Sequence, residues 1–231
     1  MGLNKPIAII PARGGSKRVK NKNIAEINGR PLLCYTIDVC LESNIFSEVY
    51  VNTDDDVIYD LSQQCGAKVY LRPDEYATDS AYVIDAIKEM ISTLNLQREN
   101  IGILLPTSPL RTAVDLINAW ELYQTKNRSV VSVCKYETPV QLAHFVNKNG
   151  ELEPFFPADY KVTTKSYGHQ QSYRFNGGIV FNSAKQLLKQ SNLIGISPFP
   201  YIMPEERSID IDYPYQLEII KMILKNRTLD L

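Results

Sequence analysis

A cluster of positive charge follows the first apolar segment of the chain. Five cations stand within ten residues: Arg13, Lys17, Arg18, Lys20 and Lys22. Gly14 and Gly15 lie inside this cluster, and adjacent glycines let the backbone approach a ligand and turn N–H groups toward phosphate oxygens. The segment therefore predicts a phosphate-binding loop, with a solvated basic loop as the alternative. It has neither the G-x-x-x-x-G-K-[ST] nor the G-x-G-x-x-G pattern, which argues against a P-loop NTPase and a dinucleotide site.

Two carboxylates near the other end of the chain complement these cations. They belong to the run Ser208-Ile209-Asp210-Ile211-Asp212, and in an extended segment residues two apart face the same side. Paired carboxylates that face a polyphosphate are suited to hold Mg²⁺. Alternatively, Asp212 caps the helix that begins near Pro214, but this leaves Asp210 unexplained, so the metal site is favoured. A cationic loop with a dicarboxylate indicates metal-assisted phosphoryl or nucleotidyl transfer.

Three further loops are ambiguous. Residues 104–111 combine two prolines, hydroxyls and an arginine, so they form either a rigid wall of a base or sugar pocket or simply the start of the next helix. In the polar loop 72–80, Thr78 or Asp79 could be only a helix cap. Capping is also the favoured interpretation of Thr53-Asp54.

The elements that must position these loops follow from apolar runs separated by helical patterns. Strands are expected at residues 6–10, 48–52, 67–71, 101–105 and 129–134. Helices are expected at residues 31–40, 56–66, 80–94, 116–123 and 214–225. This alternation predicts an α/β fold with a parallel sheet, whose ligands bind at the carboxyl ends of the strands. The cationic loop stands at such an end.

The alternation is interrupted between residues 135 and 175. This stretch has no long helical stripe, and it contains Asn149-Gly150, a hairpin signal. The α/β pattern returns at residues 177–181. We therefore predict a single α/β domain over residues 1–231 with a β-rich insertion at about 135–175.

Composition excludes several classes of protein. The 231 residues include 25 Lys+Arg and 26 Asp+Glu, for a net charge of −1, and 44% are hydrophobic. These values argue against disorder and against a general nucleic-acid binder. No apolar run approaches the ~20 residues of a membrane helix, and the first residues do not resemble a signal peptide. We expect a cytoplasmic protein with no nucleic-acid or membrane partner.

Cysteines and histidines narrow the chemistry further. Cys34, Cys40, Cys65 and Cys134 are widely spaced without a Cys-x-x-Cys pair, so all four are expected to be reduced core residues. With only two histidines, His144 and His169, a multi-histidine metal site or a Ser-His-Asp hydrolase is disfavoured.

Taken in order, five blocks of the chain resemble the acylneuraminate cytidylyltransferase family, the CMP-sialic acid synthetases. The blocks are Ile9–Lys17 with Lys22-Asn23, Thr53-Asp54, Leu105–Arg111, Asn176–Gly178 and Ser208–Asp212. The resemblance spans about residues 6–220 and implies a Rossmann-like nucleotidyltransferase fold. It also implies a reaction of CTP with a nine-carbon 2-keto sugar acid, a nonulosonic acid, which yields the CMP-sugar and pyrophosphate with Mg²⁺.

The resemblance also implies roles for individual residues. Arg13, Lys22 and Asp212 would be catalytic, and Asp210 and Asp212 would bind Mg²⁺. The nucleotide would be bound by Ala12, Arg13, Gly14, Lys17, Lys22, Asn23 and Thr78. The sugar side would comprise Leu105, Pro106, Thr107, Arg111, Lys165 and Asn176. A homodimer is implied as well, in which the arm of residues 135–175 helps complete the partner's sugar site.

Departures from the family pattern all fall on the sugar side. Leu105 replaces a glutamine, and Lys165 stands where an arginine fork would bind a carboxylate. Val180, Leu193 and Ile194 stand where aromatics are usual. The sugar is therefore left open among N-acetylneuraminate, legionaminate, pseudaminate and related acids.

Three alternatives compete with this interpretation. The nearest is a 3-deoxy-manno-octulosonate cytidylyltransferase. A metal-dependent sugar-phosphate phosphatase would need an aspartyl nucleophile, and no Asp-x-Asp follows the first strand. A non-catalytic nucleotide-sugar binder need not retain both Asp210 and Asp212.

Overall fold

A seven-stranded sheet forms the centre of the computed structural model, which describes residues 4–16, 18–157 and 170–227. The strand order is β11-β7-β10-β6-β1-β4-β5, and β10 alone runs antiparallel to its neighbours β6 and β7. The strands are β1 (Ile7–Pro11), β4 (Glu48–Thr53), β5 (Lys68–Leu71), β6 (Asn100–Ile103), β7 (Val130–Lys135), β10 (Tyr173–Ser183) and β11 (Phe199–Ile202). The predicted α/β fold with a mostly parallel sheet is confirmed.

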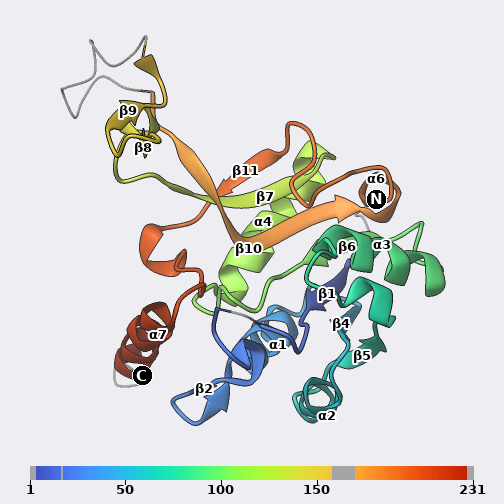
Figure 1. Ribbon diagram of the computed structural model, residues 1–231. Coiled ribbons are helices and arrows are strands. Elements are labelled where there is room, and N and C mark those ends of the chain that lie inside the picture. The colour runs from blue at the N-terminus through green and yellow to red at the C-terminus, as the bar shows by residue number, and fades with distance from the viewer. Residues whose placement is uncertain (1–3, 17, 158–169, 228–231) are drawn as a thin grey trace.

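Helices cover both faces of this sheet (Figure 1). They are α1 (Leu32–Ser43), α2 (Asp56–Gln64), α3 (Val83–Thr93), α4 (Ala113–Lys126), α6 (Ala184–Leu187) and α7 (Pro214–Arg227). Short 3₁₀ turns complete the connections: η1 (Lys22–Ile24), η2 (Asp74–Tyr76), η3 (Val140–Leu142) and η4 (Glu205–Arg207). No described helix combines the length and the apolar character that a bilayer crossing requires.

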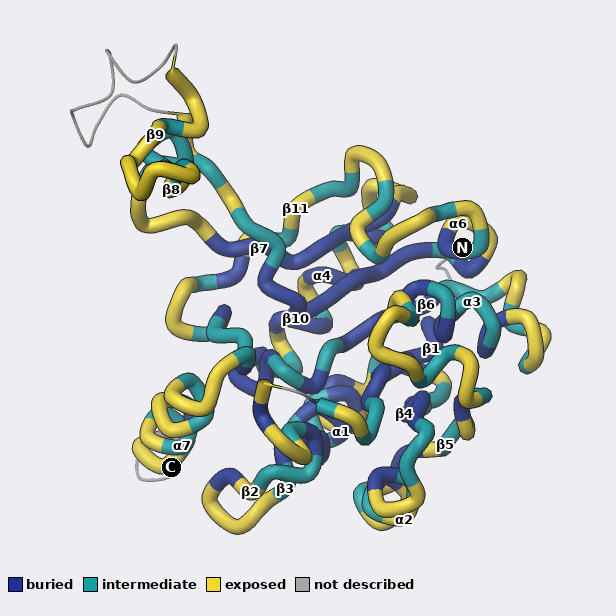
Figure 2. The backbone as a smooth tube through the Cα atoms, viewed as in Figure 1, coloured by how far each residue is buried: buried dark blue, intermediate teal, exposed yellow. Residues whose placement is uncertain are grey.

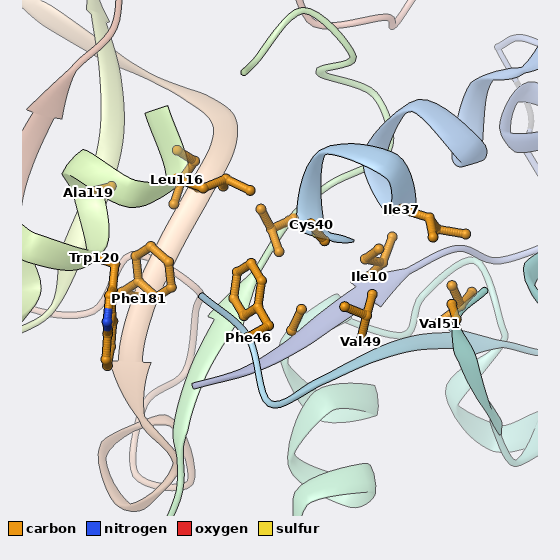
Figure 3. Close-up of a cluster of buried hydrophobic side chains, with 14 of the residues drawn as sticks. Ile10, Ile37, Cys40, Phe46, Val49, Val51, Leu116, Ala119, Trp120 and Phe181 are labelled. Atoms are coloured by element: carbon orange, nitrogen blue, oxygen red, sulfur yellow. The ribbon is translucent and has the colours of Figure 1, made fainter. Parts of the chain in front are cut away.

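The first strand shows why the sheet is buried on both sides. All five residues of β1 are buried, and successive side chains of a strand point to opposite faces. Ala8 and Ile10 pack in the core beneath α1 and α4, whereas Ile7 and Ile9 pack against α3. Figure 3 shows the first of these cores, where the ring of Phe181 lies 5.4 Å from that of Trp120, measured between centroids.

The described part of the arm, residues 135–157 and 170–175, projects from the sheet (Figure 1) and is largely exposed (Figure 2). At its base β10 pairs with β7, and further out β8 (His144–Val146) and β9 (Leu152–Pro154) form a two-stranded sheet. The predicted hairpin is confirmed, because Asn149-Gly150 lies in the turn between β8 and β9. Gly150 has a φ of +83°, a left-handed conformation that glycine adopts without strain.

Three features of the fold differ from expectation. The edge strand β11 and the small hairpin of β2 (Glu26–Ile27) and β3 (Arg30–Pro31) were not predicted. Both are short and contain proline, which weakens a strand signal. The strand expected at residues 177–181 begins at Tyr173 and extends into the arm.

The prediction that all four cysteines are reduced is wrong. Cys34 in α1 and Cys65 after α2 form a disulfide, while Cys40 and Cys134 are free and buried. The two bonded residues are 31 positions apart, and only the packing of α1 beside α2 brings them together. Burial raises the pKa of the Cys40 thiol to about 12, so this cysteine is a core residue as expected.

Candidate active site

A cleft of about 590 Å³ opens at the carboxyl ends of β1 and β6. Four stretches that are distant in the sequence line it, namely the cationic loop, the segment from the end of β5 to the start of α3, the loop after β6 and the carboxylate segment before α7. The lining residues are Pro11, Arg13, Ser16, Arg18, Val19, Lys22, Asn23, Arg72, Asp79, Val83, Leu105, Pro106, Thr107, Asp210 and Asp212. The expected meeting of the cationic loop with the carboxylate pair is therefore present in the structure.

Close packing fixes the cationic loop against the end of β4. The Gly14 N–H donates to Asp54 Oδ1 at 3.1 Å, and a Cβ at Gly14 would lie 2.5 Å from Asp55 Oδ2. A Cβ at Gly15 would meet nothing within 4 Å. Glycine is thus required at position 14 by the approach of Asp55. Asp54 holds the loop, and the cap of α2 is Asp55, which accepts from the Ile58 N–H at 2.9 Å.

Two cations of the loop, Arg13 and Lys22, are held by oxygens across the cleft. Arg13 Nη1 lies 3.2 Å from both the Thr78 carbonyl oxygen and Asp79 Oδ1. Lys22 Nζ donates to the Ile211 carbonyl at 2.6 Å and lies 3.7 Å from Asp212 Oδ1. Burial lowers the pKa of Lys22, while the charge of Asp212 opposes that shift. A bound polyphosphate would place additional negative charge beside Arg13 and Lys22.

Arg18 is a more exposed member of the same group. Its Nη1 lies 3.0 Å from Asp212 Oδ2, and its guanidinium stands 5.7 Å from the ring centre of Tyr213. The side chain is 59% exposed, so the ion pair is weak and easily exchanged.

The carboxylate pair has the properties of a cation site. Asp210 Oδ1 is buried and has no hydrogen-bond partner within the described residues. Burial raises the pKa of Asp210, opposed by a hydrogen bond from Thr107 and reinforced by the charge of Asp212. A buried, unpartnered carboxylate oxygen is costly, and a cation would remove that cost.

Magnesium fits this donor set. Mg²⁺ prefers oxygen ligands and keeps several waters, so one or two carboxylates with substrate phosphates suffice. Throughout the described ranges no group of three or more His, Cys, Asp or Glu side chains is placed to hold a metal. The remaining ligands would come from phosphate and water.

The alternative role of Asp212 as a helix cap is not what the structure shows. The backbone N–H groups of Asp212 and Tyr213 each donate to Gln216 Oε1 at 2.7 Å. Gln216 thus satisfies the start of α7, and the Asp212 carboxylate faces Lys22 and Arg18.

Two residues expected on the sugar side lie behind the wall of the cleft. Arg111 is 2% exposed and donates to the carbonyls of Gly178 and Leu105 and to Thr36 Oγ1. Burial lowers its pKa to about 10. Its position corrects the expected sugar contact, because Nη1 and Nη2 donate to the protein and the side chain does not line the cleft.

Asn176 differs from expectation in the same way. It is 1% exposed, its Nδ2 donates to Ser208 Oγ at 2.8 Å, and its Oδ1 accepts from Ser132 Oγ at 2.6 Å. A motif match identifies Arg111 and Asn176 by residue type, and it does not distinguish a residue that contacts a ligand from one that supports such a residue.

The other expected site residues occupy varied positions. Leu105, Pro106 and Thr107 line the cleft. Asn23 also lines it, but its Nδ2 donates to the Arg13 carbonyl at 2.9 Å. Ala12 is fully buried, and its N–H donates to the Asn52 carbonyl. Thr78 meets Arg13 through its backbone carbonyl. The predictions for Lys17 and Lys165 fall outside the described residues.

Arg72 is a cleft residue that the sequence analysis did not single out. It is 5% exposed, and its guanidinium donates to Asn52 Oδ1 at 2.6 Å and to the Asn52 carbonyl at 3.0 Å. Burial lowers its pKa. One indication of this position is present in the sequence: Arg72 directly follows β5, and the carboxyl ends of parallel strands lie at the same edge of the sheet.

The fold and the cleft together are typical of a nucleotidyltransferase, with a cationic cleft at the carboxyl edge of a mostly parallel sheet. The chain belongs to the cytidylyltransferase family, whose match covers residues 7–229.

Curated relatives are similar over almost the whole chain. An N-acylneuraminate cytidylyltransferase of Escherichia coli is 37% identical over 96% of this chain and 53% of its own length. A pseudaminic acid cytidylyltransferase of Campylobacter jejuni is 32% identical over 96% of this chain and 97% of its own. A CMP-N,N′-diacetyllegionaminic acid synthase of Legionella pneumophila is 29% identical over 95% and 96%. The chain thus spans about half of the first relative and nearly all of the other two.

Solved structures share the fold at low sequence identity. A CMP:2-keto-3-deoxy-manno-octonic acid synthetase complexed with CTP has a TM-score of 0.68 at 17% identity, over 96% of this chain and 98% of the other. A 4-diphosphocytidyl-2C-methyl-D-erythritol synthase has a TM-score of 0.69 at 13% identity, with the same coverage. These likenesses confirm the Rossmann-like nucleotidyltransferase architecture.

Proposed function

We propose that the protein transfers the cytidylyl group of CTP to a nonulosonic acid, giving the CMP-sugar and pyrophosphate. The observation that carries this proposal is the cleft in which Arg13 and Lys22 face Asp210, whose Oδ1 has no partner among the described residues. Family membership supports the cytidylyl donor. The names of the relatives support a nonulosonic acid as the acceptor, but they differ in the acid and leave it open.

Different residues of the cleft would bind the phosphates and hold the metal ion during the reaction. The anomeric hydroxyl of the sugar attacks the α-phosphorus in line, and pyrophosphate leaves from the opposite side. Arg13 and Lys22 bind the phosphates and stabilise the charge that grows on the leaving oxygens. Asp210 and Asp212 would hold Mg²⁺, which supplies further charge neutralisation and can lower the pKa of a bound hydroxyl.

The sugar end of the cleft has an apolar wall at Leu105 and Pro106. Leucine at position 105 offers no amide to a sugar hydroxyl, so discrimination there depends on shape and apolar contact. An eight-carbon keto acid, as in the octulosonate alternative, is a second candidate because the octonic acid synthetase shares the fold. We favour the nine-carbon acids because the curated relatives act on them by name.

We also propose that the arm of residues 135–175 joins two copies of the chain. Seven of its described large hydrophobic side chains are exposed: Tyr136, Phe145, Val146, Leu152, Phe155, Phe156 and Tyr173. An apolar surface of this kind marks an interface more often than a solvated face. The predicted contribution of Lys165 to the partner's sugar site and the cytoplasmic location stay predictions.

The function is tested with purified protein, CTP, Mg²⁺ and a panel of nine-carbon and eight-carbon keto acids. We expect pyrophosphate release with at least one nonulosonic acid, a CMP-sugar of the matching mass, and loss of both signals with EDTA. Release of inorganic phosphate from a sugar phosphate would indicate the phosphatase instead. Absence of pyrophosphate with every acid would contradict the proposal.

A further inference from the structure

Asp115, in the first turn of α4, is a buried carboxylate that the proposed reaction does not use. It is 1% exposed and accepts hydrogen bonds from three elements. The Thr112 N–H and hydroxyl donate to Oδ2 at 2.9 and 2.8 Å. Arg207 Nε donates to Oδ2 at 3.0 Å and Nη2 to Oδ1 at 2.8 Å, and the Tyr201 hydroxyl donates to Oδ1 at 3.0 Å. Both carboxylate oxygens are therefore engaged.

These contacts join the two walls of the cleft. Thr112 ends the loop that begins with Leu105, Pro106 and Thr107, which form one wall. Arg207 ends η4 immediately before residues 208–212, which carry the carboxylates of the other wall. Asp115 touches the far end of each wall without lining the cleft itself.

A second contact holds the walls together nearer to the metal ligands. The Ile211 N–H donates to the Thr107 carbonyl at 2.8 Å, so the backbone beside Asp210 is tied to the loop after β6. Only residues 208–210 separate Arg207 from Ile211. A shift of Arg207 must therefore displace Asp210 or strain that bond.

We propose that the Asp115–Arg207 pair is a positioning device that sets the spacing of the carboxylate segment from the loop after β6, and thereby the affinity for a divalent cation. This inference rests on the proposed function. The planar guanidinium fixes both distance and direction through two parallel bonds, whereas a lysine would hold only a point charge. A buried ion pair is by itself weak evidence that the pair stabilises the fold. We therefore assign the Asp115–Arg207 pair a role in positioning the carboxylate segment.

The test compares Arg207→Lys with two matched controls. Ser183→Ala removes the hydroxyl that caps α6, does not touch the cleft and leaves Asp115 and Arg207 intact, and therefore reports a loss of stability alone. Arg30→Lys disrupts an exposed arginine–aspartate pair, Arg30 with Asp38, that also has two bonds. The measurements are the Mg²⁺ concentration at half-maximal pyrophosphate release, the KM for CTP at saturating Mg²⁺, the melting temperature, and Mn²⁺ binding without CTP by water-proton relaxation.

We expect Arg207→Lys to raise half-saturating Mg²⁺ and the Kd for Mn²⁺ about tenfold, as changes beside metal ligands commonly do. The KM for CTP at saturating Mg²⁺ should stay within about twofold, and both controls should keep the parental metal dependence. Unchanged metal affinity in Arg207→Lys, or an equal rise in Ser183→Ala, would overturn the inference. If the parent protein binds Mn²⁺ but releases no pyrophosphate, the proposed function fails while the Mn²⁺ comparison still decides the positioning role.

Discussion

The cleft and the arm differ in how many of their side chains find partners within a single chain. In the cleft, Arg13, Lys22 and Arg72 donate hydrogen bonds to oxygens of other segments of the same chain. In the arm, β8 and β9 make one small sheet that leaves apolar residues such as Val146 and Leu152 exposed. The described residues of the cleft come together within one chain, whereas in the dimer proposed above a second copy would cover the apolar side chains of the arm.

Removing a negative charge from the cleft is expected to have the largest effect. Asp212→Asn should lower kcat by roughly 10³-fold, because one of the two carboxylates that would hold the charge-neutralising Mg²⁺ is lost. The melting temperature should change little, since the side chain is 39% exposed. Steady-state kinetics and thermal unfolding measure the two effects, with Asp38→Asn as an exposed control. Near-normal activity would place the metal site elsewhere.

A smaller change tests how tightly the cationic loop is held. Gly14→Ala would set a Cβ 2.5 Å from Asp55 Oδ2, so the loop must move, whereas Gly15→Ala meets nothing within 4 Å. We expect Gly14→Ala to reduce kcat/KM for CTP roughly 10- to 100-fold, the usual effect of misplacing a binding group by about an ångström. Gly15→Ala should resemble the parent protein. Equal losses in the two variants would show that the packing against Asp55 is unimportant.

The arm is tested by a charge placed on its apolar surface. Leu152→Asp should weaken dimerisation at least about tenfold, the effect expected for a buried interface residue. CTP binding to the single chain should be preserved. Sedimentation velocity over a concentration series measures the first effect and calorimetry the second. Ile196→Asp is the matched control, because Ile196 is 89% exposed and lies outside the arm. A parent protein that is monomeric and fully active would contradict the shared sugar site.

The smallest expected effect is a change in the pH dependence of stability. Burial alone would raise the pKa of Asp115, but hydrogen bonds from Arg207 and Thr112 outweigh it and hold the pKa below 3.8. A carboxyl whose folded pKa is depressed contributes stability that is complete above its unfolded pKa and is lost as pH falls through the folded value. In urea titrations between about pH 5 and pH 3, the parent should lose more unfolding free energy than Asp115→Asn. Equal losses of unfolding free energy in the parent and in Asp115→Asn would contradict this role of Asp115.

Local patterns were sufficient to predict much of the fold and part of the candidate site. The bounded apolar run at residues 6–10 predicted a strand buried on both faces, and β1 is such a strand. The rule that ligands bind at the carboxyl ends of strands placed the cationic loop at the right edge of the sheet. Arg111 and Asn176 could not be assigned in this way, because residue type does not reveal whether a polar side chain faces the cleft or the protein behind it.

The sequence by itself determined which chemical groups are present and the order in which strands and loops present them. Strand alternation and the spacing of Asp210 and Asp212 depend on backbone geometry that acts within a few residues. Only the tertiary structure decided which groups meet: Asp212 with Lys22 and Arg18, Asp115 with Arg207, and Cys34 with Cys65. Such contacts arise when helices and strands pack into layers, and the relative positions of those layers are set by the whole core rather than by any local pattern.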